Sequence, residues 1–495
     1  MLFNSLHYLI YLPMVVGSYF LCPHRWRWLL LLIASYYFYM CWSADYAVKV
    51  EYALLLLVST SVAYAAGRGI AATDDPRRKK KFLWASITVL LGILFTFKYY
   101  NFANDSVRGV CAALNFSFTI PHSELLLPIG ISFYTFQKIS YVVDVYNGSA
   151  KVEKHFGIFA VYSCFFPQLV AGPIERPKHL LHQFYERHDF SYENAIAGLR
   201  QILWGTFKKV VVADRVAILV QGVYADPHTY AGLPLLVATI FYAFQIYCDF
   251  SGYTDIALGS AKLLGFDLMA NFRQPYFSKS IPEFWRRWHI SLSTWFKDYV
   301  YIPLGGNRVV KWRWYYNLFI TFFISGLWHG ANWKWGLWGA LHGGYMVLDS
   351  FLGGGRDWLR SKLKNVFTQT AFDGFNLALT FALVTVAWIP FRAANLSDAW
   401  FVFTHLFTGA GRWLDLGADA IQFRGMGVDG MELMLSVIFI GIVVIYDWFD
   451  SRGGVWESLK TKPVPVRWAV YYALMILVLF YGPYNQAQNF IYFQF

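Results

Sequence analysis

The 495-residue chain has few charged residues, since Asp, Glu, Lys and Arg together make up 15% of it. Soluble globular proteins average ~25%, so the low charge argues against a string of soluble domains. The chain also has only five cysteines and no CxxC pair, which excludes a disulfide scaffold and offers no pair for zinc or redox chemistry. Internal repeats and Gly/Ser-rich linkers are missing too, so the sequence marks no boundary between domains.

What the chain has instead is apolar and aromatic side chains. Hydrophobic residues make up 57% of the sequence, and the aromatic residues alone make up 20%. This content excludes intrinsic disorder, and apolar runs near the length of a membrane span recur along the chain. We therefore predict an all-α polytopic membrane protein. Its candidate spans lie at about 5–21, 28–44, 52–67, 82–97, 156–172, 231–248, 375–391, 433–446 and 468–483.

The net charge of +12 is concentrated in short loops, which is typical of membrane proteins whose basic loops face the cytoplasm. A nucleic-acid patch would need a soluble domain to present it, so no nucleic-acid partner is expected. One basic loop follows the first apolar run and another, at 77–81, follows the third. With the later loops, and with the acidic segment 392–432 outside, this predicts both termini on the outer face. The first apolar run has no basic residues before it, so we expect a span rather than a signal peptide.

The regular pattern of spans fails between about 120 and 350. Apolar stretches there are short and contain Arg, Lys, Asp, His, Gly and Pro. Irregular backbone at membrane depth is tolerated only where protein or a wet cavity surrounds it, and ionisable residues there are candidates for function. We therefore expect one membrane domain over 1–495, with peripheral spans over 1–120, a catalytic core over about 120–350 and C-terminal spans over 375–495.

The segment 280–308 predicts a helix with one aromatic face. Ser280 and Glu283 have the spacing of a capping box at its start. Apolar residues then recur at steps of three and four, which makes an interfacial amphipathic helix the simplest interpretation. The residues of this face are Trp285, Trp288, Leu292, Trp295 and Tyr299.

His289 is the functional candidate within that segment. Arg286 precedes it by one turn and Ser293 follows it by one turn. A nearby cation favours the neutral imidazole, which is the form that a base or a hydrogen-bond acceptor needs.

The segment 315–348 contains no carboxylate and one lysine. As a single helix its 34 residues would measure about 51 Å against a ~30 Å hydrocarbon core, yet they are too few for two full spans. Basic residues flank both sides. We therefore predict a broken or re-entrant hairpin with both ends at the cytoplasmic side and its break between Gly326 and Asn332. The first arm, about 21 Å long, would leave His329 inside the membrane.

The sequence predicts different roles for the histidines and carboxylates of the core segment. His329 lies at a Gly-flanked break without a nearby acid or second histidine, which suits a general base or an acyl carrier. His342 follows Trp338 on an aromatic stripe and is predicted to be a packed core residue. No metal site is predicted, because the HxxH of His179 and His182 lacks further ligands. The carboxylates of DFSGYTD could bind a cation, but capping or network roles are favoured; they are Asp249 and Asp255.

Several long motifs closely resemble those of the bacterial membrane-bound O-acyltransferase family. They are DFSGYTD (249–255), the segment 271–308, GLWHGAN (326–332), LLPIGISFYTFQ (126–137) and FPQLVAGPIERP (166–177). The nearest branch is that of alginate O-acetyltransferase membrane subunits, with peptidoglycan O-acetyltransferase and teichoic-acid D-alanyl transfer membrane proteins as relatives. The resemblance implies roughly 10–12 transmembrane or re-entrant helices around a central funnel, in the bacterial inner membrane.

The resemblance also implies roles for particular residues. His329 corresponds to the family's principal catalytic histidine and His289 to its second functional histidine. Acetyl-CoA is the implied donor, as a substrate rather than a bound cofactor. Beyond the resemblance, we expect supporting roles for Asn332, Ser293, Trp328, Asp249 and Asp255. The donor's phosphates are expected near basic side chains that could equally anchor lipid headgroups: Arg286, Arg287, Lys297 and Arg308.

The expected function is O-acetylation of an extracytoplasmic polysaccharide such as alginate. The chain has no recognisable SGNH-type hydrolase domain, so a separate periplasmic SGNH-type acetyltransferase is the implied partner, beside membrane lipids and the donor. The motif at 166–177 departs from the alginate branch, which leaves peptidoglycan or another glycan, a lipid or protein acceptor, or D-alanyl transfer as alternatives. A transporter or channel, the alternative from another class, predicts inverted repeats that the sequence does not show.

Overall fold

The computed structural model describes residues 1, 3–41, 49–125, 127–170, 172–363, 365–412, 430–484 and 490–491. Every regular element in these residues is a helix, which confirms the all-α class. By length and apolarity six helices can cross a membrane: Val50–Ala71, Pro76–Ala113, Leu233–Leu263, Val366–Arg392, Gly430–Asp450 and Val464–Tyr481. Six of the predicted apolar runs coincide with them. The expected 10–12 helices counted re-entrant ones as well, so the two numbers do not measure the same thing.

The chain divides into two compact units. Unit 1 comprises Met1–Ile202 and Tyr253–Ala270, and unit 2 comprises Leu203–Gly252 and Asn271–Phe495. Helices α10 (Tyr192–Thr206) and α12 (Leu233–Leu263) contribute residues to both. The single membrane domain expected from the sequence stays a prediction.

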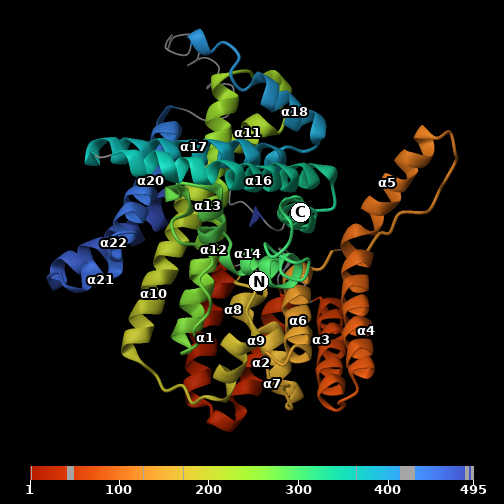
Figure 1. Ribbon diagram of the computed structural model, residues 1–495. Helices are drawn as coiled ribbons and strands as arrows, with labels where there is room; N and C mark the ends of the chain where they lie inside the picture. The colour runs from red at the N-terminus through yellow and green to blue at the C-terminus, as the bar shows by residue number, and fades with distance from the viewer. Residues whose placement is uncertain are drawn as a thin grey trace. The chain divides into compact units, whose positions relative to one another are not determined.

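Unit 1 is a bundle in which α3, α4 and α6 pack together and α7 packs against α2 and α3. Figure 1 shows α4 continuing through the π-helix η1 into α5, which extends past α3 and α6. The elements before α10 are α1 (Leu6–Leu21), α2 (His24–Met40), α3 (Val50–Ala71), α4 (Pro76–Leu94), η1 (Phe95–Tyr99), α5 (Tyr100–Ala113), α6 (Ile131–Tyr146), α7 (Phe156–Cys164), α8 (Phe166–Leu169), α9 (Pro177–Leu180) and η2 (Leu181–Tyr185).

The span predicted at 156–172 is wrong. Helix α7 has nine residues, or about 14 Å of helix, and ends before Phe165, whose backbone is not helical. The short α8 follows, with Pro167 in its first turn. All residues of α7 after Phe156 are buried inside unit 1. The run is apolar because protein surrounds it, and an apolar run looks the same whether protein or lipid covers it.

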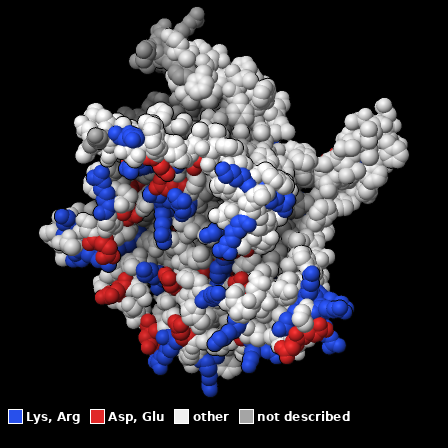
Figure 2. Space-filling view, in the orientation of Figure 1, with Lys and Arg blue, Asp and Glu red and all other residues white. Residues whose placement is uncertain are grey.

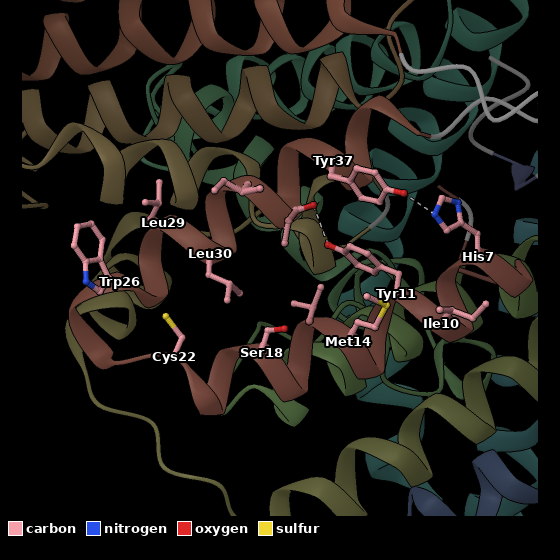
Figure 3. Close-up of a pocket in the computed structure, with 13 residues that line it drawn as sticks. His7, Ile10, Tyr11, Met14, Ser18, Cys22, Trp26, Leu29, Leu30 and Tyr37 are labelled. Carbon is pink, nitrogen blue, oxygen red and sulfur yellow. Dashed lines mark hydrogen bonds between the residues drawn. The ribbon is translucent and has the colours of Figure 1, made fainter.

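An apolar groove of about 780 Å³ runs between α1 and α2. Figure 3 shows Ile10, Met14 and Leu30 among the side chains that line it. At one end His7 Nε2 lies 3.0 Å from the hydroxyl of Tyr37, across the groove. The groove belongs to unit 1, whereas the two candidate histidines belong to unit 2. This apolar groove therefore does not lie where the motifs place the chemistry.

Unit 2 contains the hairpin of α15 and α16, against which α17 packs. Of the segment 392–432, predicted to face outside, residues 413–429 lie beyond the described residues. The elements of unit 2 are η3 (Phe207–Ala213), α11 (Asp214–Tyr224), η4 (Pro227–Thr229), η5 (Pro275–Phe277), α13 (Ile281–Arg287), α14 (Ile290–Phe296), η6 (Lys297–Tyr301), α15 (Lys311–His329), α16 (Trp333–Lys362), α17 (Val366–Arg392), α18 (Leu396–His405), η7 (Ala410–Arg412), α20 (Gly430–Asp450), α21 (Val455–Lys460) and α22 (Val464–Tyr481).

Candidate active site

The segment 280–308 forms two short α-helices rather than one helix, and the second continues into the π-helix η6. Ser280 caps the first of them, α13, as predicted, because its side chain accepts a hydrogen bond from the backbone N–H of Glu283. Helix α13 ends at Arg287, and α14 begins only after His289, which has φ 42° and ψ 55°. This left-handed conformation costs a non-glycine residue free energy and persists only where the surroundings enforce it. The break therefore places backbone strain at one of the two candidate histidines.

The aromatic face of this segment points into protein, so the predicted interfacial helix is wrong. Trp285, Trp288 and Trp295 are 7%, 2% and 5% exposed, and Leu292 is 1% exposed. The periodicity correctly identified one continuous apolar face. It could not tell a face that packs against other helices from one that lies in the headgroup region.

Asn271 holds the broken segment together. Its carbonyl oxygen accepts from the backbone N–H of Ile290 at 2.9 Å. Its side-chain oxygen accepts from the backbone N–H and the hydroxyl of Ser291, at 3.1 and 2.7 Å. A helix N-terminus needs acceptors for its first N–H groups, and the His289 side chain makes no capping hydrogen bond there. Asn271, which sequence reasoning missed, takes the place of that cap although it lies 20 residues before Ser291 in the chain.

The predicted break in the hairpin is present. Helix α15 ends at His329, and α16 begins after Asn332. The side-chain oxygen of Asn332 caps α16 by accepting from the backbone N–H of Lys334 at 3.0 Å. Because α15 already begins at Lys311, its 19 residues measure about 28 Å, which is longer than the predicted arm. The depth of His329 in the membrane stays a prediction.

Glycines bring the two arms of the hairpin close together. A Cβ atom at Gly326 would lie 2.3 Å from the carbonyl oxygen of Trp335, and one at Gly339 would lie 2.5 Å from that of Phe322. Small residues at a helix contact allow such a backbone approach. Gly326 is one turn before His329, so this contact fixes the position of His329 at the end of α15.

Both candidate histidines lie in one buried aromatic cluster. His289 is 0% and His329 is 5% exposed. The ring of Trp328 has its centroid 6.4 Å from that of His289 and 4.9 Å from that of His329. Phe250 lies 4.7 Å from His289, and Trp338 lies 4.9 Å from His329. Two motifs that are separate in sequence are therefore brought together around Trp328.

Burial lowers the pKa of His289, which lies outside the six candidate spans, to about 3. The neutral imidazole is thus the stable form, as expected, but for a different reason. The sequence suggested Arg286 as a neighbouring cation, whereas Arg286 is exposed and removal of the ring from water accounts for the shift.

The remaining supporting residues have mainly structural contacts. Ser293 donates its hydroxyl to the carbonyl oxygen of Trp288 at 3.1 Å. Both aspartates of DFSGYTD lie inside α12, so neither caps a helix. Asp249 pairs with the buried Lys209 at 2.7 Å and accepts from the backbone N–H of Ile491 at 2.6 Å. Asp255 accepts from Gln201 at 3.2 Å in unit 1. These contacts fit the predicted network role, and no described group of His, Cys, Asp and Glu has the arrangement of a metal site.

The basic candidates for donor binding are at the surface of unit 2. Arg286, Lys297 and Arg308 are exposed. Arg287 is half-buried and forms an ion pair with Glu283 at 2.7 Å, which offsets its charge. Their role toward the donor stays a prediction.

His342 has the contacts of a packed core residue. It is 0% exposed, and its Nδ1 accepts from Trp285 Nε1 at 3.3 Å. Its ring lies between aromatic neighbours, with Trp338 at 4.8 Å and Trp285 at 4.9 Å. These contacts fit the packing role expected for it.

Comparison with known proteins defines the class. The family model for the membrane-bound O-acyltransferase family matches residues 155–353, a stretch that includes His289 and His329. The probable alginate O-acetylase AlgI of Pseudomonas aeruginosa is 39% identical over 451 residues, which cover 90% of this chain and 82% of that protein. The peptidoglycan O-acetyltransferase of Helicobacter pylori is 33% identical, with 81% and 78% covered. A teichoic acid D-alanyltransferase of Streptococcus thermophilus is 30% identical over 56% of this chain and 71% of its own.

The chain therefore belongs to the membrane-bound O-acyltransferase family, and it is a multi-pass membrane enzyme that transfers acyl groups. The residues that sequence reasoning missed contact the two histidines or hold their segments. Asn271 stands at the start of a recognised motif, but nothing in its local pattern indicates a cap for a later helix. Trp338 and Phe391 flank His329, and only the fold brings Phe391, from α17, to within 5.3 Å of it.

Proposed function

We propose that this acyltransferase takes acetyl groups from a cytoplasmic thioester donor, acetyl-CoA, for the O-acetylation of an extracytoplasmic polysaccharide such as alginate. The observation that carries the proposal is the pairing of His329, at a helix break, with His289 in one buried aromatic cluster. The names of the relatives at 39% and 33% identity support acetyl over D-alanyl as the group transferred.

In the proposed reaction His329 acts as the general base. Its neutral imidazole takes the proton of the acceptor hydroxyl while the hydroxyl oxygen attacks the thioester carbonyl. The C–S bond then breaks, and the departing thiolate receives the proton from His329. Acetyl has moved from sulfur to oxygen, and the imidazole is neutral again.

The surroundings of the histidines support this chemistry. The aromatic rings exclude water, which would otherwise hydrolyse the thioester, and their low polarity strengthens each dipole that faces the reacting atoms. His289 would stabilise developing charge or orient the groups as a neutral hydrogen-bonding ring. Trp328, next to both imidazoles, keeps their spacing, while Asn332 fixes the start of α16 directly after His329.

The proposal also covers the cellular location of the enzyme and the protein with which it works. The enzyme would lie in the bacterial inner membrane with both termini in the periplasm. The donor would enter from the cytoplasm, and a separate periplasmic SGNH-type acetyltransferase would complete the transfer onto the sugar. The basic loops of the sequence support this orientation.

The test is transfer of a labelled acetyl group by the full-length enzyme in proteoliposomes. His329→Gln removes the base, so we expect a loss of at least a hundredfold, within the range of general-base catalysis. His342→Gln is the matched control, because it changes another buried histidine of the same hairpin and keeps a hydrogen-bond acceptor for Trp285. Undiminished transfer by folded His329→Gln protein would refute the assignment.

A second experiment identifies which acyl group the enzyme transfers. The wild-type enzyme is offered a labelled acetyl thioester and a labelled D-alanyl thioester in parallel. Incorporation of D-alanine without acetyl would contradict the proposed donor while leaving the acyltransferase class intact.

A further inference from the structure

A pocket of about 540 Å³ lies in unit 1, between the loop that follows α6 and the turn of α9 and η2. Its volume falls in the range of small-molecule sites. Three lysines line it, together with apolar side chains that form its walls. The lysines are Lys151, Lys154 and Lys178, and the apolar residues are Val152, Pro177 and Leu181.

The charges around this cavity do not balance. Among the residues that the structure describes, none of the three lysine ammonium groups has a carboxylate within 4.0 Å. The cavity's own carboxylate, Glu153, is buried and directed elsewhere: its Oε1 accepts from the Tyr185 hydroxyl and from the backbone N–H of His155, both at 2.6 Å. His182, also in the lining, is 3.6 Å from Glu186. Positive charge therefore exceeds negative charge in the lining, and all three lysines are exposed and accessible to an anion.

Helices α3 and α6 show which end of unit 1 carries the cavity. Lys138 of α6 donates to Ser59 of α3 at 2.7 Å, and further along both helices the ring of Tyr141 approaches Gly67. The two helices thus run in the same direction, and both end near the cavity. The hydroxyl of Tyr64 donates to the carbonyl oxygen of Lys154 at 2.6 Å, which ties the loop after α6 to α3.

This end of unit 1 is basic beyond the cavity itself. Figure 2 shows Lys and Arg side chains gathered over the end where α3 leads into α4, with acidic side chains beside them. Residues 77–81, five consecutive basic residues, form the start of α4 there. Short basic segments of membrane proteins face the cytoplasm, so the cavity is expected to open to the cytoplasm.

We propose that this cavity binds the phosphate groups of an anionic ligand. Lysine ammonium groups bind phosphate oxygens as point charges through charge-assisted hydrogen bonds. At a cytoplasmic membrane surface two sources supply such groups: the nucleotide phosphates of coenzyme A, and the phosphodiester of an acidic phospholipid. The first source rests on the proposed function, in which coenzyme A is the carrier of the acetyl group. The second source does not depend on it.

The experiment uses full-length enzyme in nanodiscs of phosphatidylcholine, with coenzyme A, which has no acyl group to transfer, as the probe. Binding is measured by calorimetry at low and high salt, and dephospho-coenzyme A shows whether a phosphate is recognised. The cavity variant is Lys151→Gln, Lys154→Gln and Lys178→Gln combined. The matched control removes the same number of charges from α4: Lys79→Gln, Lys80→Gln and Lys81→Gln. Thermal unfolding establishes that both variants are folded.

If coenzyme A is the ligand, the cavity variant binds it at least tenfold more weakly, the control changes less than threefold, and high salt weakens the binding of wild type. If a phospholipid is the ligand, wild type retains phosphatidylglycerol from mixed nanodiscs in native mass spectrometry and only the cavity variant loses it. Equal losses in both variants, or no selective binding of either probe, would overturn the proposal. Neither measurement involves acyl transfer, so failure here is distinct from failure of the His329 assignment.

Discussion

The close contact of α15 and α16 makes Gly326→Ala a sensitive perturbation of the candidate site. The new Cβ would lie 2.3 Å from the carbonyl oxygen of Trp335 and 2.8 Å from the Cα atom of Gly339. Both are backbone atoms, so no side-chain rotation relieves the overlap. Restoring a van der Waals distance of ~3.5 Å requires the helices to move apart by about 1 Å.

Two effects oppose each other in this substitution. Overpacking of a close contact costs ~1–3 kcal/mol, while replacing glycine by alanine inside a helix contributes ~0.5–1 kcal/mol of stability. We expect a net destabilisation of about 1–2 kcal/mol. The activity should fall further than stability does, because displacing a reacting group by 1 Å can reduce a rate about a hundredfold, and Gly326 lies one turn before His329.

Gly344→Ala is the matched control for this prediction. It makes the same chemical change in α16, but nothing lies within 4 Å of the position where its Cβ would be. There only the backbone effect remains, so the substitution should stabilise the protein by ~0.5–1 kcal/mol. Thermal unfolding and acetyl transfer by the two purified variants provide the comparison. If Gly326→Ala is as stable and as active as Gly344→Ala, the hairpin contact does not position His329.

Three further predictions concern the broken helix and the other polar cluster. Asn271→Ala should destabilise the protein by ~1 kcal/mol because α14 loses its side-chain acceptor, while Asn271→Asp keeps an acceptor oxygen and should retain most of the stability; equal melting temperatures would contradict the cap. His289→Gly should be more stable than His289→Ala by ~1 kcal/mol, since glycine adopts the left-handed conformation without strain, and thermal unfolding of the two measures this. The hydrogen bond from His179 to Glu175, at 2.8 Å, raises the pKa of His179, so its stabilisation is present below the ordinary value of ~6.5 and is lost as pH rises through the raised pKa. The melting temperature should therefore fall over that interval in wild type and less so in His179→Asn.

Local signals in the sequence predicted much of this structure correctly. The cap at Ser280, the hairpin break before Asn332 and the six helices that are long and apolar enough to cross a membrane each depend on residues close together in the chain. Capping needs a side-chain oxygen a few residues from the N–H that it accepts from. A span needs only an uninterrupted apolar run.

The tertiary structure decided three further features. The aromatic face of 280–301 is buried by protein, α7 is an interior helix rather than a span, and His289 interrupts a helix whose cap comes from Asn271. Periodicity reports that a face is apolar but not what covers it, and a left-handed residue is enforced by contacts that no local window contains. The sequence alone therefore determined that this chain is a helical membrane protein with two candidate histidines. Only the packing of α13, α14 and the α15–α16 hairpin decided that these histidines share one buried cluster around Trp328, because burial and long-range contact depend on all the surrounding elements at once.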